Sequence, residues 1–313
     1  MTGPVYLARG GEQVFAQPFI AEKVQFFGFA VKADKAKLQA ICDRYLNGPT
    51  GTHDFQPLVG SLFFVFNRLA KLYAKNPPDN VRGWYSEQEA AVWMLVYDSK
   101  RQKLAWYLPY ILVDSSYAMA MGREIYGFPK EFGWFDIPDG PAAPTSMKVE
   151  TVVVEALVPN CQALQKPLFT AQRADGGTRA TPDQQVRASD QLTRALVEGL
   201  HVANDVAPAI SASQLQQLLS VPIPMVFLKQ FRDGVQPATA CFQSVQEVPI
   251  VMTRFHDARL YWHRYEIVFQ DWASHPLRSD LGLAAGPIPV DMAYWAMFDF
   301  EIGTCTEVWR ALT

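Results

Sequence analysis

The sequence has no long apolar segment and no strong excess of charge of either sign. Its longest apolar runs, such as 62–66 and 90–97, are far shorter than the roughly 20 residues that cross a bilayer. Residues 1–14 contain no apolar signal core. The 28 Lys and Arg residues nearly balance the 31 Asp and Glu residues and are not gathered into blocks, so no basic surface for nucleic acid is expected. These absences predict a cytoplasmic protein without a membrane or nucleic-acid partner.

Motifs for metals, nucleotides and nucleophilic serines are also missing. There is no Gly-rich phosphate loop, no nucleophile-elbow serine and no His-Glu-x-x-His pair. His256 and His263 are seven residues apart, which on one continuous strand places them on opposite faces. The cysteines are too far apart for a zinc or redox motif, and we expect reduced, mostly buried thiols: Cys42, Cys161, Cys241 and Cys305. The sequence therefore predicts no metal and no organic cofactor.

What the sequence does contain is a large apolar fraction in a pattern dominated by strands. Hydrophobic residues make up 49% of the 313 residues and aromatic residues 13%, which suits one packed globular domain over 1–313. Helical spacing of apolar residues predicts an amphipathic helix over Asp34–Leu46, before Asn47, Gly48 and Pro49. Residues rich in Val, Ile, Tyr, Phe and Trp predict strands over 90–97, 104–113, 117–126, 147–158, 225–231, 248–256, 259–270 and 294–302.

This element order favours a mainly β (α+β) fold with a few peripheral helices. The polar span 98–102 predicts a hairpin between the first two strands, and many strands with few helices between them favour an antiparallel sheet. Closure into a barrel would remove exposed strand edges.

The polar, Gln-rich segment 162–220 interrupts the strand pattern. A helix is predicted over about 182–201, with Leu192, Leu196 and Leu200 as its apolar stripe, and a short second helix over 211–220. We interpret the segment as a helical insertion that acts as a lid or subunit contact. The alternative is a helical layer that covers one end of the barrel.

The run Gly122–Lys130 places one lysine among aromatic residues, at a Gly and Pro interruption of an apolar strand. Lys130 could be held out of water there, or it could be a turn lysine that lies along aromatic surface. Upstream, Glu87 and Glu89 are two residues apart and would share one face of a strand, as carboxylates for proton transfer might. They could equally be solvated glutamates at an edge.

The run Gly122–Lys130 resembles the signature of the acetoacetate decarboxylase family, in which a Gly-Arg-Glu strand leads into a Pro-Lys pair. Gly83–Glu87 resembles that family's Gly-x-Tyr-x-Glu segment, and 34–46 and 225–229 are similar to its early helix and to a later barrel strand. The resemblance spans roughly residues 18–302. It implies a cone-shaped antiparallel β-barrel, an active site inside the barrel and a homo-oligomer.

The resemblance also implies roles for individual residues. Lys130 matches the lysine that forms a Schiff base with a keto acid, and Glu87 matches the active-site carboxylate. Glu89, Arg123, Glu124, Tyr126 and Phe128 are expected to bind substrate. Two positions depart from the decarboxylases. Glu131 replaces a second lysine, and no arginine stands near Val24, where Lys23 is the nearest cation.

A Schiff-base lysine must be a neutral amine when it attacks a ketone, yet a free lysine has a pKa near 10.4. Since Glu131 replaces the neighbouring cation, burial is expected to lower the pKa of Lys130. If the local chain is extended, Glu131 points away from Lys130 and could pair with Arg123.

The predicted function is that of a Schiff-base lyase that acts on a small keto acid. The protonated imine would accept the electrons that remain when carbon dioxide leaves, and Glu87 would move protons at the adjacent carbon. Two alternatives stay open. One is a Schiff-base aldolase or dehydratase for pyruvate-like substrates, and the other is a non-catalytic barrel that binds an apolar ligand.

Overall fold

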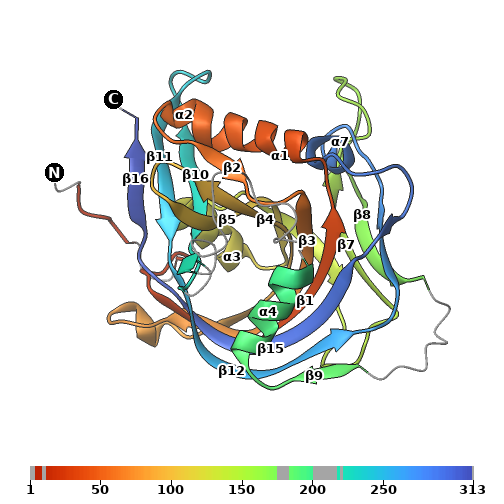
Figure 1. Cartoon of the computed structure of the whole chain (residues 1–313). Coiled ribbons are helices and arrows are strands. Elements are labelled where there is room, and N and C mark those ends of the chain that lie inside the picture. Colours follow the sequence, from red (N-terminus) through yellow and green to blue (C-terminus); the bar gives the residue numbers. More distant parts are fainter. Residues whose placement is uncertain (1–3, 9–11, 175–182, 200–216, 219–220, 312–313) are drawn as a thin grey trace.

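The computed structural model describes residues 4–8, 12–174, 183–199, 217–218 and 221–311. All sixteen strands of this part of the chain belong to one sheet (Figure 1). The strands are β1 Phe19–Lys32, β2 Phe55–Pro57, β3 Ser61–Ala74, β4 Tyr85–Asp98, β5 Lys103–Val113, β6 Lys130–Asp136, β7 Ser146–Val153, β8 Leu164–Arg173, β9 Gln184–Val186, β10 Met225–Arg232, β11 Ala240–Val248, β12 Ile250–Tyr261, β13 Tyr265–Phe269, β14 Ile288–Pro289, β15 Met292–Ile302 and β16 Thr306–Arg310.

The helical segments are short and lie between strands. They are α1 Lys35–Cys42, η1 Asp43–Asn47, α2 Gly48–Thr50, η2 Asp79–Val81, α3 Ser116–Met121, η3 Gly122–Tyr126, α4 Ser189–Gly199 and α7 Leu277–Leu281. The prediction of a mainly β fold with a few helices is therefore confirmed.

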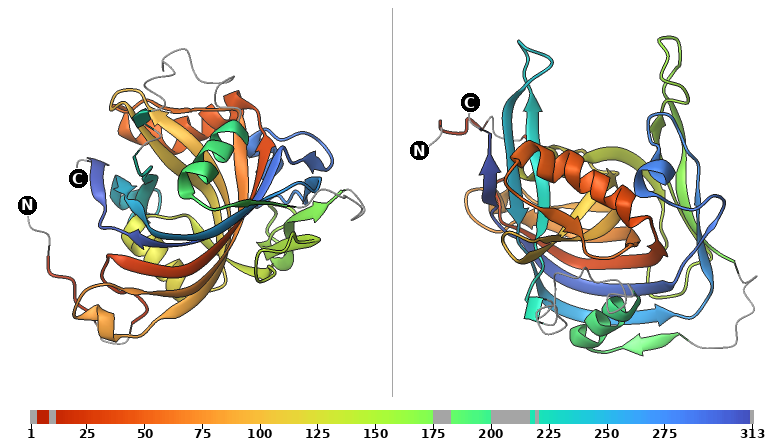
Figure 2. Two further views of the ribbon diagram at one scale, coloured as in Figure 1. Left: turned by 60° about the horizontal axis from the view of Figure 1, so that its bottom comes forward. Right: turned by 45° about the horizontal axis from the view of Figure 1, so that its top comes forward.

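The sheet follows the order β14-β13-β8-β7-β6-β5-β4-β3-β1-β15-β12-β9, and β10, β11, β16 and β2 pair beside this path. Figure 2 shows that the sheet curves strongly. Within the described residues the two ends of the path, β14 and β9, do not pair with each other, so closure into a cone-shaped barrel stays a prediction. Most pairs are antiparallel, but β6 and β10 each run parallel to β5.

The two faces of the central strands differ in what covers them. On β3, Phe64 and Phe66 are fully buried and pack edge to face on Phe169 of β8. Phe63 and Val65 alternate with them, so they point to the opposite face, where they line a cavity. One face of the sheet thus builds a solid core, and the other bounds the site described below.

The predicted helix over 34–46 is confirmed as α1 followed by η1. The Asp34 side chain caps it by accepting a hydrogen bond from the backbone N–H of Ala36. Leu38, Ile41 and Leu46 are buried beneath it. The apolar spacing read from the sequence therefore identified the buried face of this helix.

The prediction of a strand over 117–126 is wrong, because this segment forms α3 and η3. Ser115 caps α3 by accepting a hydrogen bond from the N–H of Ala118. The physical reason lies in the sheet: β5 and β6 are parallel neighbours, and parallel strands need a crossover connection, usually a helix. Gly127, with φ of 76°, ends the helical segment in the left-handed region that glycine favours.

Two other predicted strands are interrupted. Pro249, which has no backbone N–H, separates β11 from β12 within the predicted strand 248–256. Residues 262–264 lie between β12 and β13 within the predicted strand 259–270.

The segment 162–220 is only partly an insertion. Its first part forms β8, which pairs with β7 and β13 inside the sheet, so the prediction missed a strand there. The Gln, Lys and Pro residues of β8 obscured it, although Leu168, Phe169 and Ala171 are buried. The predicted helix over 182–201 is observed as β9 and α4. The second predicted helix and Leu200 lie outside the described residues, apart from 217–218.

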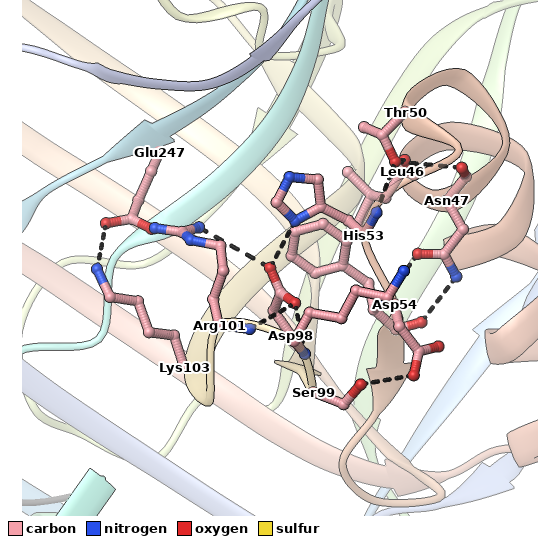
Figure 3. A network of polar contacts seen from close by, with 12 residues as sticks. Leu46, Asn47, Thr50, His53, Asp54, Asp98, Ser99, Arg101, Lys103 and Glu247 are labelled. Carbon is pink, nitrogen blue, oxygen red and sulfur yellow. Dashed lines mark hydrogen bonds and ion pairs between the residues drawn. The ribbon is translucent and has the colours of Figure 1, made fainter.

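The predicted hairpin at 98–102 is confirmed as the turn between β4 and β5. Figure 3 shows the polar network around it. The Asp98 side chain is only 1% exposed. It lies 2.8 Å from Nδ1 of His53 and accepts hydrogen bonds from the backbone N–H groups of Lys100 and Arg101. Arg101 in turn pairs with Glu247 of β11 at 2.6 Å, so the network ties this turn to the neighbouring strands.

The structure describes no helix with the length and apolar character that crossing a membrane requires. Among the same residues, no three His, Cys, Asp or Glu side chains gather in a way that could hold a metal ion. The four cysteines are free thiols; Cys42 is buried and Cys241 is exposed.

Candidate active site

Lys130 is the first residue of β6, and the pairing with β5 sets its position. Its backbone lies beside Ile111 in the parallel register, directly after Pro129. Successive residues of a strand point to opposite faces. Lys130 is 7% exposed while Glu131 points outward, as expected from the sequence. The alternative of a turn lysine that lies along aromatic surface and carries its amine out to solvent is therefore wrong.

Two carboxylates from β4 meet the amine of Lys130. The Nζ atom donates a hydrogen bond to Oε1 of Glu87 at 2.8 Å and lies 3.3 Å from Oε2 of Glu89. Glu87 is only 3% exposed, which excludes the alternative of a solvated edge glutamate. The side-chain amide of Asn67, on β3, donates to Oε1 of Glu89 at 3.0 Å and holds that carboxylate in place.

The electrostatics of this cluster differ from the sequence prediction. Burial lowers the pKa of Lys130, but Glu87 and Glu89 raise it by more, so its pKa lies above the ordinary value of 10.5. A pKa lowered by burial was predicted, and that prediction is wrong because it did not place two carboxylates against the amine. Burial raises the pKa of Glu87 to about 7, although the attraction of Lys130 lowers it.

The cluster opens into a cavity of about 400 Å³. Among the described residues that line it, Lys130, Glu87 and Glu89 alone carry charge. Much of the remaining wall is aromatic, with contributions from Phe26, Trp93, Trp106, Tyr294 and Phe298. The amine thus stands at a polar spot in an apolar cavity.

A glycine lets the lysine side chain lie where it does. A Cβ atom on Gly122 would stand 2.7 Å from Cδ and 3.2 Å from Cε of Lys130. Gly122 follows α3 and has helical dihedral angles, so its backbone does not require glycine. Glycine at position 122 therefore leaves the space that the side chain of Lys130 occupies.

The structure brings together only some of the residues predicted to bind substrate. Tyr126 and Phe128, whose rings stack 5.0 Å apart, line the cavity together with Glu89. Arg123 instead donates to the backbone oxygen of Lys130, and Glu124 accepts from the hydroxyl of Tyr6. Neither of these two lines the cavity, because the helical turn directs them away from it.

The expected pairing of Glu131 with Arg123 is also wrong. Oε2 of Glu131 lies 2.9 Å from Nε2 of His275. Lys23, the cation nearest to the missing arginine, is exposed and does not line the cavity.

Sequence reasoning missed Asn67 and the contact of Gly122 with the lysine. Asn67 carried a signal, as a single amide inside the apolar run of β3. Leu192 and Leu196 of α4 line the cavity, and α4 follows β9, which pairs with β12 (Figure 1). Of the two interpretations of 162–220, the position of α4 against the cavity fits a lid or a helical layer, and neither is decided by it.

Comparison with known proteins shows a likeness in structure alone. No protein-family model and no curated protein matches the sequence. An acetoacetate decarboxylase from Legionella pneumophila is similar over 100% of this chain and 94% of its own, with a TM-score of 0.63 and 15% identity. An acetoacetate decarboxylase-like enzyme from Sphingomonas wittichii RW1 is similar over 99% and 100%, with a TM-score of 0.56 and 13% identity.

A third similar structure is that of the enduracididine biosynthesis enzyme MppR in complex with pyruvate. It matches 98% of each chain with a TM-score of 0.60 and 13% identity. The same enzyme has also been solved with the condensation product of pyruvate and imidazole 4-carboxaldehyde. The chain therefore has the fold of acetoacetate decarboxylase and of enzymes similar to it, as the resemblance at Gly122–Lys130 implied.

Proposed function

We propose that this protein is an enzyme that makes or breaks carbon–carbon bonds through an imine between Lys130 and a carbonyl substrate. The observation that carries the proposal is the buried amine of Lys130, 2.8 Å from Glu87, in a cavity of about 400 Å³. Removing a charged amine and its carboxylate partners from water costs free energy that pairing only partly offsets, and buried ionisable groups with shifted pKa values are typical of active sites.

Because the pKa of Lys130 is raised, its ammonium group must lose a proton before it can react, and Glu87 is the base that accepts this proton. Its carboxylate takes a proton from the ammonium group, and the neutral amine then adds to the substrate carbonyl. The carbinolamine loses water to give a protonated imine. Because the pKa of Glu87 is about 7, this group can both accept and return a proton near neutral pH. The ion pair with the carboxylate thus becomes the route by which the lysine is activated.

The protonated imine accepts an electron pair when a bond at the adjacent carbon breaks. Loss of carbon dioxide leaves an enamine directly, and cleavage of an aldol does so when the carboxylate of Glu87 takes the proton of its hydroxyl group. The enamine then regains a proton at carbon from Glu87, which has taken it from that hydroxyl group or, after loss of carbon dioxide, from water. Water then hydrolyses the imine and restores the amine, so the water lost on imine formation is returned. The scheme uses neither a metal ion nor an organic cofactor.

Within this scheme, aldol or dehydration chemistry is the second candidate beside decarboxylation. The observation in its favour is the absence, among the described lining residues, of any cation besides Lys130 that could hold a substrate carboxylate. The structure of MppR with a pyruvate condensation product offers a precedent within the same fold. Release of carbon dioxide from acetoacetate by the purified protein would decide for decarboxylation.

Reductive trapping tests the proposal. Incubation with borohydride and a ketone, either acetone or 4-phenylbutan-2-one, should add the reduced ketone to Lys130, as peptide mass spectrometry would detect. Lys130→Arg keeps the positive charge beside Glu87 but forms no such adduct. A folded wild-type protein that acquires no adduct at Lys130 from either ketone or from pyruvate would contradict the proposal, and would favour a protein that binds an apolar ligand without turnover.

A further inference from the structure

The cavity around Lys130 also indicates which carbonyl compounds it accepts. We propose that the substrate is a bulky, uncharged, apolar ketone or aldehyde rather than a small keto acid. This inference rests on the imine chemistry proposed above and selects its aldol branch, because loss of carbon dioxide requires a carboxylate on the substrate. It follows from the charges, the size and the wall of the cavity.

The charge of the site opposes a second carboxylate. Lys130, Glu87 and Glu89 together carry a net charge of −1 when all three are ionised, and no other described lining residue is charged. When the amine loses its proton to Glu87, Glu89 remains as an anion close to the reacting nitrogen. A keto acid would bring another negative charge into this apolar space, where repulsion between like charges is poorly screened.

The cations near the site are engaged elsewhere. The guanidinium group of Arg123 donates to the backbone oxygen of Lys130, and Nζ of Lys229 donates to the backbone oxygen of Ile125. Neither residue lines the cavity. A substrate carboxylate therefore finds no counter-ion among the described residues of the wall other than the amine that must react.

The cavity is also larger and more apolar than a pyruvate-sized molecule needs. A volume of about 400 Å³ falls in the range of pockets that enclose ligands of drug size. Glu89 and Trp93 lie on the same face of β4, and a rise of about 3.3 Å per residue puts their Cα atoms about 13 Å apart. The aromatic wall thus extends well beyond the amine along the strand.

The far part of the wall comes from four separated elements, β1, β4, β5 and α4. Trp93 packs edge to face on Phe26 and on Trp106. Leu192 and Leu196 of α4 also line the cavity. Such a surface suits an aryl or long alkyl group attached to the reacting carbonyl, because burial of that group removes apolar area from water.

A pair of matched probes tests the inference. 4-Phenylbutan-2-one and 2-oxo-4-phenylbutanoate share the same phenylethyl group and differ in whether a methyl group or a carboxylate flanks the ketone. In trapping experiments with borohydride, the ketone should modify Lys130 at a concentration at least about tenfold lower than the keto acid requires. Acetone, which is uncharged but small, should need a higher concentration than 4-phenylbutan-2-one.

The outcomes separate this inference from the proposed function. If the keto acid, or pyruvate, modifies Lys130 as readily as 4-phenylbutan-2-one, imine chemistry stands and the substrate class proposed here is wrong. If no probe modifies Lys130 in the folded protein, the proposed function itself fails.

Two valine substitutions test the role of cavity size. Val65 lines the cavity, whereas Val152 of β7 is 46% exposed and does not. Val65→Phe should raise the concentration of 4-phenylbutan-2-one needed for trapping by more than it raises that of acetone. Val152→Phe should leave the ratio of the two as in the wild type. Leu196→Trp on α4 narrows the cavity from the other side and serves if Val65→Phe does not fold. An unchanged ratio in a folded narrowed variant would overturn the inference.

Discussion

The ammonium group of Lys130 shares its buried site with two carboxylates, and Lys130 and Glu87 each shift the pKa of the other. The positive charge of Lys130 forms ion pairs with Glu87 and Glu89. Because these ion pairs raise the pKa of Lys130, they also keep its amine protonated. In the proposed reaction, formation of the imine depends on how readily Glu87 takes that proton. Burial makes the carboxylate of Glu87 a better proton acceptor, because it raises its pKa to about 7.

Glu87 should make the stability of the protein depend on pH in a definite direction. Its pKa is about 7 in the folded protein against an ordinary 4.5, so the folded state binds more protons between these values. Stability from this group is present at low pH and is lost as the pH rises through that window. The difference in unfolding free energy between wild type and Glu87→Gln should therefore fall by up to about 3 kcal/mol from pH 4.5 to pH 7.

Urea unfolding of both proteins across this range measures the effect. Glu155→Gln, at an exposed glutamate that pairs with Lys166, is the control and should follow the wild type. Parallel pH profiles for wild type and Glu87→Gln would contradict the prediction.

The contact between Gly122 and the lysine leads to a second prediction at this scale. In Gly122→Ala the new methyl group meets the methylene chain of Lys130 at 2.7 Å and displaces the amine. The rate of reductive trapping should fall between about tenfold and a hundredfold, because small misplacements of a reacting group have effects of that size. Unfolding free energy should change little, since the backbone at residue 122 is helical.

Gly234→Ala is the matched control for this substitution. A Cβ atom at Gly234 would meet no other atom within 4 Å, and its trapping rate should equal that of the wild type. Equal trapping rates in Gly122→Ala and Gly234→Ala would show that residue 122 does not position the lysine.

At the scale of the elements, β4 connects the candidate active site to the β4–β5 turn. The strand carries Glu87 and Glu89 near its start and ends at Asp98. The turn that follows is fixed by the buried carboxylate of Asp98, as Figure 3 shows. The strand that holds both carboxylates is therefore anchored at its far end by a separate polar network.

Asp98→Asn should destabilise the protein by about 1 to 3 kcal/mol, since it replaces a buried oxygen that accepts hydrogen bonds by an amide donor. Urea unfolding would measure this loss. Lys103→Ala removes an exposed ion pair with Glu247 in the same network, and we expect it to change stability by less than about 1 kcal/mol. A loss in Asp98→Asn no larger than that in Lys103→Ala would contradict the prediction.

Local patterns predicted the elements well where one face is apolar and the caps are clear. The Asp34 cap and the spacing of Leu38 and Ile41 suffice for α1. The same reasoning failed for 117–126, because Tyr117, Ile125 and Tyr126 favour strands locally. The helix there follows from the parallel pairing of β5 with β6, which is a property of the whole sheet. Strand β8 was hidden because polar residues occupy its outward positions.

At the scale of the whole molecule, the sheet serves two purposes with its two faces. In the solid core, the centroid of the Phe64 ring lies 5.2 Å from that of Phe169 and 5.1 Å from that of Phe269. Its neighbour Phe63 lines the cavity. The same residue type thus stabilises the fold at one position and shapes the site at the next.

These adjacent phenylalanines give a matched pair of substitutions. Phe64→Ala should cost about 3 to 5 kcal/mol of unfolding free energy because it leaves a void in close-packed surroundings. The loss of unfolding free energy in Phe63→Ala should be smaller than that in Phe64→Ala by about 1 to 2 kcal/mol, because the space beside the Phe63 ring is already open. Chemical denaturation of both variants measures the difference, and equal losses would indicate that the cavity side is packed as tightly as the core.

The site could be predicted from the sequence only in part. The pattern around Gly122–Lys130 identified the lysine, and the segment ending at Glu87 identified its partner. The charge environment could not be predicted, because it depends on the register that brings β4 beside β5 and β5 beside β6. That register sets Glu89 against the amine as well, and so reverses the expected direction of the pKa of Lys130.

The close approach of Gly127 to β10 limits how this site could be rebuilt by protein engineering. A Cβ atom on Gly127 would stand 2.5 Å from Cα of Lys229, and Nζ of Lys229 donates to the backbone oxygen of Ile125. The stretch 122–130 and Lys229 are therefore complementary in shape and pack closely, although about a hundred residues separate them in the sequence. A chimera that receives 122–130 as a cassette from another protein should assemble its lysine correctly only if the matching part of β10 is exchanged with it.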